Sequence, residues 1–177
     1  MATNTERAGA DLFGRGLALD VDGGWAGYWV VMLRLITGWW FFHAGITKLM
    51  EGGLMMDATG WMQYGAQGTL VHPITNWFAQ NAAWLPNLMI PMGETLIGLG
   101  LLVGCLTRLA AFFGTFLMVF FYVGNAGFAN GLVNGDLMGL LLFVTLIVFA
   151  AGRVMGIDGW LAETEFAENN AWVRYLI

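Results

Sequence analysis

Long apolar runs separated by polar segments dominate the pattern of this chain. Such runs fall at about residues 28–47, 86–106, 109–129 and 132–151. A hydrocarbon core of about 30 Å takes roughly 20 residues of α-helix to cross, so each run is predicted to span a membrane. The runs do not alternate apolar and polar positions as the strands of a membrane barrel do. The pattern therefore predicts an all-α, integral membrane four-helix bundle.

The polar stretches divide the chain into parts. Residues 1–24 form a polar N-terminal tail, residues 25–153 the four-span membrane domain, and residues 154–177 an amphipathic C-terminal tail in which Glu and Trp recur. That last tail is predicted to be an amphipathic helix on the membrane surface. We expect one membrane domain without a second globular domain.

Two connections carry further predictions. The long one, residues 51–84, mixes polar residues with tryptophan, and because structureless loops of this length are uncommon we expect short helices in it. His72-Pro73 predicts a break between two of them, since the residue before proline avoids the helical region. Thr107-Arg108 predicts a tight reversal between the second and third spans, which makes these spans a helical hairpin.

Composition and charge refine the class. With 58% hydrophobic and 11% charged residues, the chain departs from soluble domains, in which about 25% of residues are charged. The net charge of −5 disfavours nucleic-acid binding. The excess of carboxylates over a single lysine fits a halophilic source, because hydrated carboxylates resist salting out. Ordinary acidic tails explain it equally well.

The distribution of cations predicts the orientation. With four spans both termini lie on one side of the membrane, and that side collects most of the cations, whereas Lys48 lies opposite. Because cytoplasmic segments carry the excess of Lys and Arg, we expect a plasma-membrane protein with both termini cytoplasmic and the long loop outside. The cations on the predicted cytoplasmic side are Arg7, Arg15, Arg108, Arg153 and Arg174.

Ionisable side chains within the spans are the candidates for function. Arg34, His43 and Lys48 lie in the first span and Glu94 in the second. A charge in hydrocarbon costs about 2.5 kcal/mol or more, so each must face protein, water or the interface. Counting residues places His43 and Glu94 at one depth, with Lys48 and Asp136 at the outer rim and Arg34 below. We predict a polar cluster of His43, Glu94, Lys48 and Asp136.

The scarcity of soft ligands limits the redox chemistry. One cysteine and two histidines cannot form a disulfide, an iron–sulfur cluster or a pair of axial haem ligands within the spans. Carboxylates do not recur at metal-ligand spacing, so no metal site is predicted. If electrons pass through this chain, we expect a diffusible quinone as the acceptor and a partner subunit as the source.

An ordered set of motifs resembles the DoxX family of four-helix membrane proteins. The resemblance covers about residues 28–160, and the long first outer loop is similar to the DoxD branch, the small membrane subunit of thiosulfate:quinone oxidoreductase. The motifs are Arg34-x-x-x-Gly38-x-x-Phe41-x-x-x-Gly45-x-x-Lys48-Leu49, Gly93-Glu94-x-x-x-Gly98, Gly104-x-x-Thr107-Arg108, Gly152-Arg153 and Ile157-Asp158.

The resemblance implies a quinone-linked role in a respiratory chain. Glu94 and His43 are then the candidate catalytic residues, as proton acceptor and relay. Arg34, Lys48 and Asp136 are the candidate substrate-binding residues. A structural interpretation stands beside each role: Glu94 neutralises Arg34 or Lys48, His43 is a buried ring, Arg34 pairs with carbonyls or a carboxylate, and Asp136 caps the fourth helix.

Three functions remain open at this level. The first is a membrane subunit that passes electrons from a sulfur donor such as thiosulfate, or from a donor-side partner subunit, to quinone. The alternative is a non-catalytic membrane anchor or assembly subunit of a larger respiratory complex, and homo-oligomers fit either. A small-solute transporter fits less well, because no span is both broken and repeated.

Overall fold

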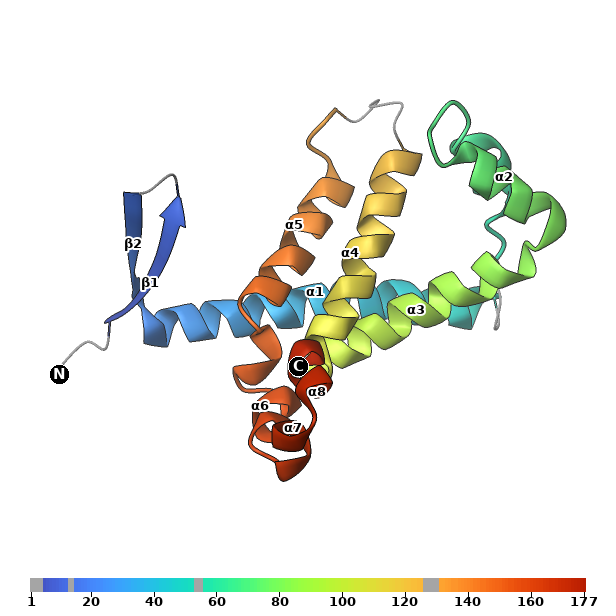
Figure 1. Ribbon diagram of the computed structural model, residues 1–177. Coiled ribbons are helices and arrows are strands. Elements are labelled where there is room, and N and C mark those ends of the chain that lie inside the picture. Colours follow the sequence, from blue (N-terminus) through green and yellow to red (C-terminus); the bar gives the residue numbers. More distant parts are fainter. Residues whose placement is uncertain (1–4, 13–14, 53–55, 126–130) are drawn as a thin grey trace.

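The computed structural model describes residues 5–12, 15–52, 56–125 and 131–177, with side chains for those from residue 24 onward except Arg174. Figure 1 shows an assembly of helices preceded by a strand hairpin. Three described helices are long and apolar enough to cross a membrane, and a shorter apolar helix accompanies them. The predicted all-α membrane fold is confirmed. The helices are α1 Gly23–Gly52, α3 Trp84–Val103, α4 Thr107–Gly124 and the shorter α5 Gly135–Val148.

Glycines bring α1 and α3 into close antiparallel contact, and the two helices run side by side in Figure 1. A Cβ at Gly45 would overlap the backbone of Thr95, and one at Gly98 would overlap the backbone of Phe42. Small residues allow membrane helices to approach in this way. Gly104, by contrast, ends α3 with a positive φ of 68°, and its lack of a side chain lets the backbone of Gly156 come close.

The second pair of helices, α4 and α5, extends away from the first pair in Figure 1. Its core is the fully buried Phe143, whose ring occupies the space that a side chain at Gly114 would need. Phe143 also meets Phe41 of α1 edge to face, with ring centroids 4.6 Å apart. The neighbouring Trp39 and Trp40 are exposed, whereas Phe41 is buried in the core.

The long connection contains the short helices that were predicted. They are η1 Trp61–Gly65, which has π-helical geometry, and α2 His72–Asn81. The helix α2 begins at the predicted break, with proline in its first turn. Asn87 of α3 holds the connection in place: its carbonyl accepts from the Met56 N–H at 3.1 Å, and its Oδ1 accepts from the Ala58 N–H at 2.9 Å.

Both ends of the chain depart from the picture of simple tails. The N-terminal tail forms an antiparallel hairpin of β1 Thr5–Leu12 and β2 Arg15–Asp22. The C-terminal tail is not one amphipathic helix but several short ones, because Thr164 caps a new helix by accepting from the Ala167 N–H. These helices are α6 Ile157–Ala162, α7 Glu165–Asn169 and α8 Ala171–Leu176, and the short 3-10 helix η2 Ala151–Arg153 precedes them.

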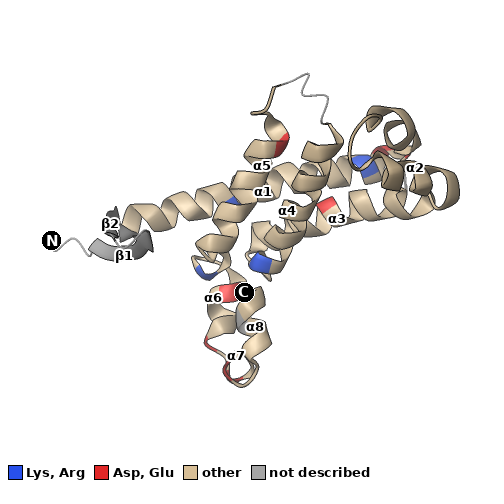
Figure 2. Cartoon of the chain, turned by 45° about the horizontal axis from the view of Figure 1, so that its top comes forward, with Lys and Arg blue, Asp and Glu red and all other residues tan. Residues whose placement is uncertain are grey.

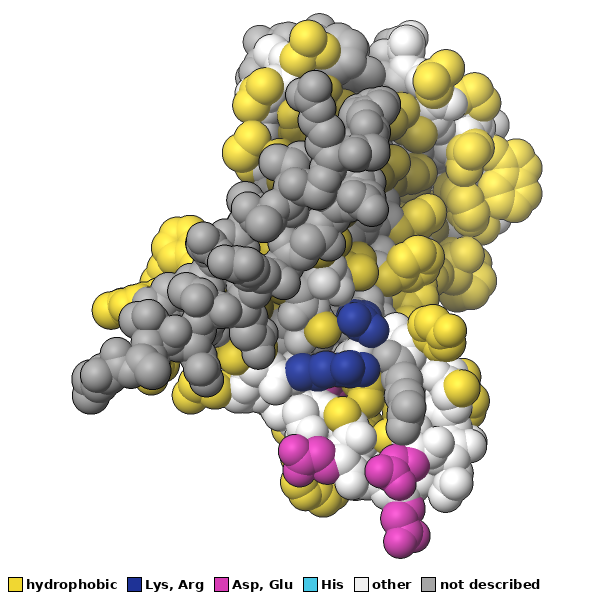
Figure 3. Space-filling view, turned by 60° about the vertical axis from the view of Figure 1, so that its left-hand side comes forward, with side chains coloured by type: hydrophobic (Ala, Val, Ile, Leu, Met, Phe, Trp, Pro, Cys, Tyr) yellow, Lys and Arg dark blue, Asp and Glu magenta, His cyan; other side chains and the backbone are white. Residues whose placement is uncertain are grey.

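Surface chemistry separates the tail from the membrane helices. Figure 2 shows few charged residues along α1, α3, α4 and α5. Figure 3 shows hydrophobic side chains over much of one face and acidic side chains at the tip formed by the C-terminal helices. Glu163, Glu165 and Glu168 are exposed there. This contrast fits a membrane domain with a water-facing C-terminal segment.

Candidate functional site

Glu94 and Lys48 form a partly buried ion pair between α3 and α1. The Lys48 Nζ lies 2.6 Å from Glu94 Oε1 and 2.5 Å from Oε2. Gly45, one turn before Lys48, lets the two backbones meet at Thr95, and this contact sets the level at which the charges meet. Glu94 is only 5% exposed, and a charge buried there without a partner would be costly. The predicted neutralisation of Glu94 by Lys48 is confirmed.

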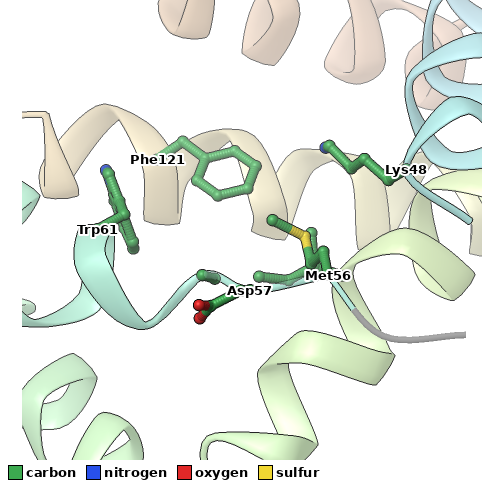
Figure 4. A pocket seen from close by; sticks show the side chains of 7 residues that line it. Lys48, Met56, Asp57, Trp61 and Phe121 are labelled. Carbon is green, nitrogen blue, oxygen red and sulfur yellow. The ribbon is translucent and has the colours of Figure 1, made fainter. Parts of the chain in front are cut away.

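A recess of about 220 Å³ opens beside this pair. In Figure 4 the Lys48 side chain extends toward Phe121. Because Lys48 is 33% exposed whereas its partner is buried, its ammonium group connects the buried carboxylate to the recess. The residues that line the recess are Lys48, Met56, Asp57, Ala58, Trp61, Ile90 and Phe121.

The walls of the recess are mostly aromatic or aliphatic, with one further charge. Trp61 and Phe121 meet edge to face with ring centroids 6.0 Å apart. Asp57 is exposed, and hydrogen bonds from the side chain and backbone of Thr59 hold the pKa of Asp57 below its usual value. Its carboxylate is therefore charged at neutral pH. The recess can hold a flat apolar ring beside one cationic hydrogen-bond donor and one water-facing carboxylate.

Sequence reasoning identified only Lys48 among the residues that line the recess. Met56 and Asp57 precede the short helix that begins with Trp61, Ile90 lies in α3, and Phe121 in α4. No spacing rule joins residues from four separate segments. The aromatic content of the long connection was the one available signal, and it did not indicate which ring faces the membrane domain.

His43 does not join the ion pair, so the predicted cluster of four polar residues is wrong on this point. The His43 ring is exposed and lies 5.9 Å from the Trp39 ring, centroid to centroid. His43 is two residues before Gly45, which places it about 200° around the helix from the face that contacts α3. It therefore faces away from the recess, and its proton-relay role stays a prediction.

Asp136 reaches the recess only through other residues. Its Oδ2 accepts from Asn125 Nδ2 at 2.9 Å, and Asn125 Oδ1 accepts from Trp61 Nε1 at 3.3 Å. The predicted capping role is wrong, because the N-cap of α5 is Asn134, whose Oδ1 accepts from the Leu137 N–H. Asp136 lies in the first turn, where a carboxylate is favourable to the helix dipole.

Arg34 lies at the opposite end of the membrane domain and is 2% exposed. Its NH1 donates to the carbonyls of Ala151 at 2.8 Å and Val154 at 2.9 Å, and its NH2 donates to that of Met155 at 3.1 Å. The predicted pairing of Arg34 with carbonyls is confirmed. Fourteen residues of helix, about 21 Å, separate it from Lys48, so Arg34 does not reach the recess.

Asp158 completes this second polar centre. It is fully buried, and its two carboxylate oxygens accept from the backbone N–H groups of Leu106 and Thr107 at 2.6 and 2.8 Å. These bonds cap the start of α4 at the predicted reversal. A side chain at Gly104 would collide with Arg34 and Gly156. This centre therefore joins the first span, the reversal and the C-terminal segment.

A family model decides the family of this protein: the DoxX model matches residues 29–126, more than half of the chain. The chain belongs to the DoxX family. This DoxX membership indicates a membrane subunit associated with oxidoreductase activity. Comparisons with curated proteins and with solved structures gave no match. The whole recess lies inside the DoxX match, whereas Asp136 and Asp158 lie after it.

The motif residues of this DoxX protein serve two kinds of purpose. The glycines at positions 38, 45 and 98 allow α1 and α3 to approach, and Arg34 with Asp158 joins distant segments. Lys48 and Glu94 alone combine a buried charge pair with an open recess. In the described ranges, no three His, Cys, Asp or Glu side chains lie close enough to hold a metal ion.

Proposed function

We propose that this DoxX protein is the quinone-binding membrane subunit of an oxidoreductase. The observation that carries the proposal is the Lys48–Glu94 pair at the wall of an aromatic-lined recess. A quinone headgroup is a flat ring with two carbonyl acceptors. In the recess the Lys48 ammonium group can donate to one carbonyl while the ring packs against Trp61 and Phe121.

The same residues suit proton delivery. Reduction of a quinone to a quinol takes two electrons and two protons, and the electrons come from a donor-side partner subunit. Lys48 holds a proton at Nζ next to the substrate oxygen, and Glu94 keeps that ammonium group oriented. Asp57 is exposed to water and lines the same recess, which makes it a carrier for protons from solvent.

The finer assignment rests on sequence features. The long first loop is similar to the DoxD branch, which favours thiosulfate as the electron donor, oxidised by the partner subunit of a respiratory chain. The distribution of arginines favours the plasma membrane with both termini cytoplasmic. The recess is formed in part by the long connection, so this orientation places quinone chemistry near the outer surface.

The decisive experiment is quinone reduction with thiosulfate by the protein and its co-purified partner in lipid nanodiscs. Glu94→Gln and Lys48→Met each remove half of the pair, and each should abolish turnover. A single substitution also leaves one charge without its partner, which can destabilise the fold by itself. The matched control is therefore the double variant Lys48→Met, Glu94→Leu, which removes both charges and should fold. If the double variant retains turnover, the pair is not the site.

A second function has its own support. Arg34 connects segments that lie 117–121 residues apart and Asp158 connects segments 51–52 residues apart, and this architecture serves a structural membrane subunit equally well. In that case the protein is a non-catalytic anchor or assembly subunit of a larger respiratory complex. It would then co-purify in fixed stoichiometry with that complex, and Lys48 and Glu94 variants would change stability without changing the turnover of the complex.

A further inference from the structure

Trp61 is held at the recess by unusually close packing. A Cβ added at Gly124 would lie 2.8 Å from Cζ2 of the Trp61 indole, and one at Gly65 would lie 2.6 Å from its Cδ1. The absence of side chains at these two positions creates the space that the indole fills. The indole also contacts the ring of Phe121 edge to face. Trp61 is therefore a fitted wall and not a loosely placed surface residue.

A hydrogen-bond chain sets the orientation of this wall. The Trp61 Nε1–H donates to Asn125 Oδ1 at 3.3 Å, and Asn125 Nδ2 donates to Asp136 Oδ2 at 2.9 Å. An ionised carboxylate only accepts hydrogen bonds and an indole N–H only donates. Asn125 must therefore turn its amino group to Asp136 and its oxygen to Trp61. The negative charge of Asp136 therefore fixes the orientation of the Asn125 amide, so that its Oδ1 faces the Trp61 N–H.

We infer that Asp136 is a positioning residue of the recess, acting through Asn125 to hold Trp61 against the ring of a planar, carbonyl-bearing substrate beside Lys48. The hydrogen-bond chain joins three segments, since Asp136 lies in the first turn of α5, Asn125 follows α4, and Trp61 begins η1. Its contribution to substrate binding rests on the proposed function, whereas the positioning of the indole does not. It also gives Asp136 a role that requires no direct contact with substrate.

The test follows the Trp61 indole directly. In nanodiscs containing the full chain labelled with ¹⁵N-tryptophan, Trp61→Phe identifies the Trp61 indole resonance by its disappearance. Asp136→Asn should move that proton resonance upfield, because an amide at position 136 can donate as well as accept and no longer fixes Asn125. Asp136→Glu keeps the carboxylate and should preserve the resonance. Glu51→Gln removes an exposed carboxylate elsewhere and serves as the matched control.

Binding of ubiquinone-1 to the same nanodiscs provides the second readout. Asp136→Asn and Trp61→Phe should each raise its Kd by about threefold to tenfold, the usual effect of losing one hydrogen bond. An indole resonance unchanged in Asp136→Asn overturns the positioning role, whether or not ubiquinone-1 binds. A shifted resonance with an unchanged Kd overturns Trp61 as a wall of the substrate site. If the wild type binds no ubiquinone-1, the proposed function fails, and the shifted resonance alone supports the positioning role.

Discussion

Replacing Arg34 tests whether the C-terminal segment is held to the membrane domain by the guanidinium group. Arg34→Met removes the donor to three carbonyls and leaves Asp158 buried without the nearby positive charge. Each buried acceptor left unsatisfied costs about 1–3 kcal/mol, and these costs are not additive. Breaking a buried ionic arrangement by removing one member costs about 3–5 kcal/mol. We expect a loss of unfolding free energy of about 3–5 kcal/mol.

Arg34→Lys sharpens the prediction. Lysine keeps the charge but has a single nitrogen, which cannot occupy the positions of NH1 and NH2 together. Its expected loss is about 1–3 kcal/mol, between those of wild type and Arg34→Met. Steric trapping in bicelles measures the unfolding free energies of both variants. Ile36→Met, at an exposed position on the same helix, is the control and should be close to wild type.

Two results would contradict this reasoning. A loss below about 1 kcal/mol for Arg34→Met, comparable to that of the control, would mean that the carbonyl contacts do not hold the segment. Alternatively, Arg34→Lys could abolish turnover while its unfolding free energy equals that of wild type. The predicted substrate-binding role of Arg34 would then outweigh its structural role.

Further predictions concern the ion pair, the helix contact and the thiol. Lys48→Met should lower the unfolding free energy by about 3–5 kcal/mol, and adding Glu94→Leu should restore most of it; no recovery in the double variant would contradict the pair. Gly98→Ala should cost about 1–3 kcal/mol by forcing α1 away, whereas Gly93→Ala, with open space around it, should cost little. Burial, and secondarily the nearby carboxylate of Asp158, raises the pKa of Cys105. The rate of its alkylation by iodoacetamide should therefore increase only at a higher pH than the rate for a free thiol. A rate that increases at the same pH as for a free thiol, or at a lower one, would refute this.

Residue identity and the pattern along the chain were sufficient to predict several features of the fold. Apolar length and composition were sufficient for the membrane class, since water-exposed helices do not carry such runs. Thr107 was placed correctly at a reversal. The charges of Arg34 and Glu94 were correctly expected to find partners, because an uncompensated charge in hydrocarbon is too costly. Short helices in the long connection followed from the rarity of structureless loops of this length.

The identity of each partner was beyond local reasoning. His43 and Glu94 lie at similar depth along their helices, yet His43 faces outward because Gly45 and Gly98 set which face of α1 meets α3. Sequence periodicity gives the angle between two residues around one helix. It does not give the rotation of that helix about its own axis, and so it does not say which face meets a neighbouring helix. The alternative role of helix cap that was predicted for Asp136 belongs to Asn134 instead, although the place of Asp136 at the start of a helix was correct.

The sequence by itself determined the helical class, the apolar spans and the need for every buried charge to be compensated. These properties depend on neighbours along the chain and on transfer free energies, which residue identity supplies. Only the tertiary structure decided that Lys48 pairs with Glu94, that Arg34 binds the segment after α5, and that Trp61 forms a wall of the recess. Those pairings depend on helix rotation and crossing, which are set by contacts between residues far apart in the chain.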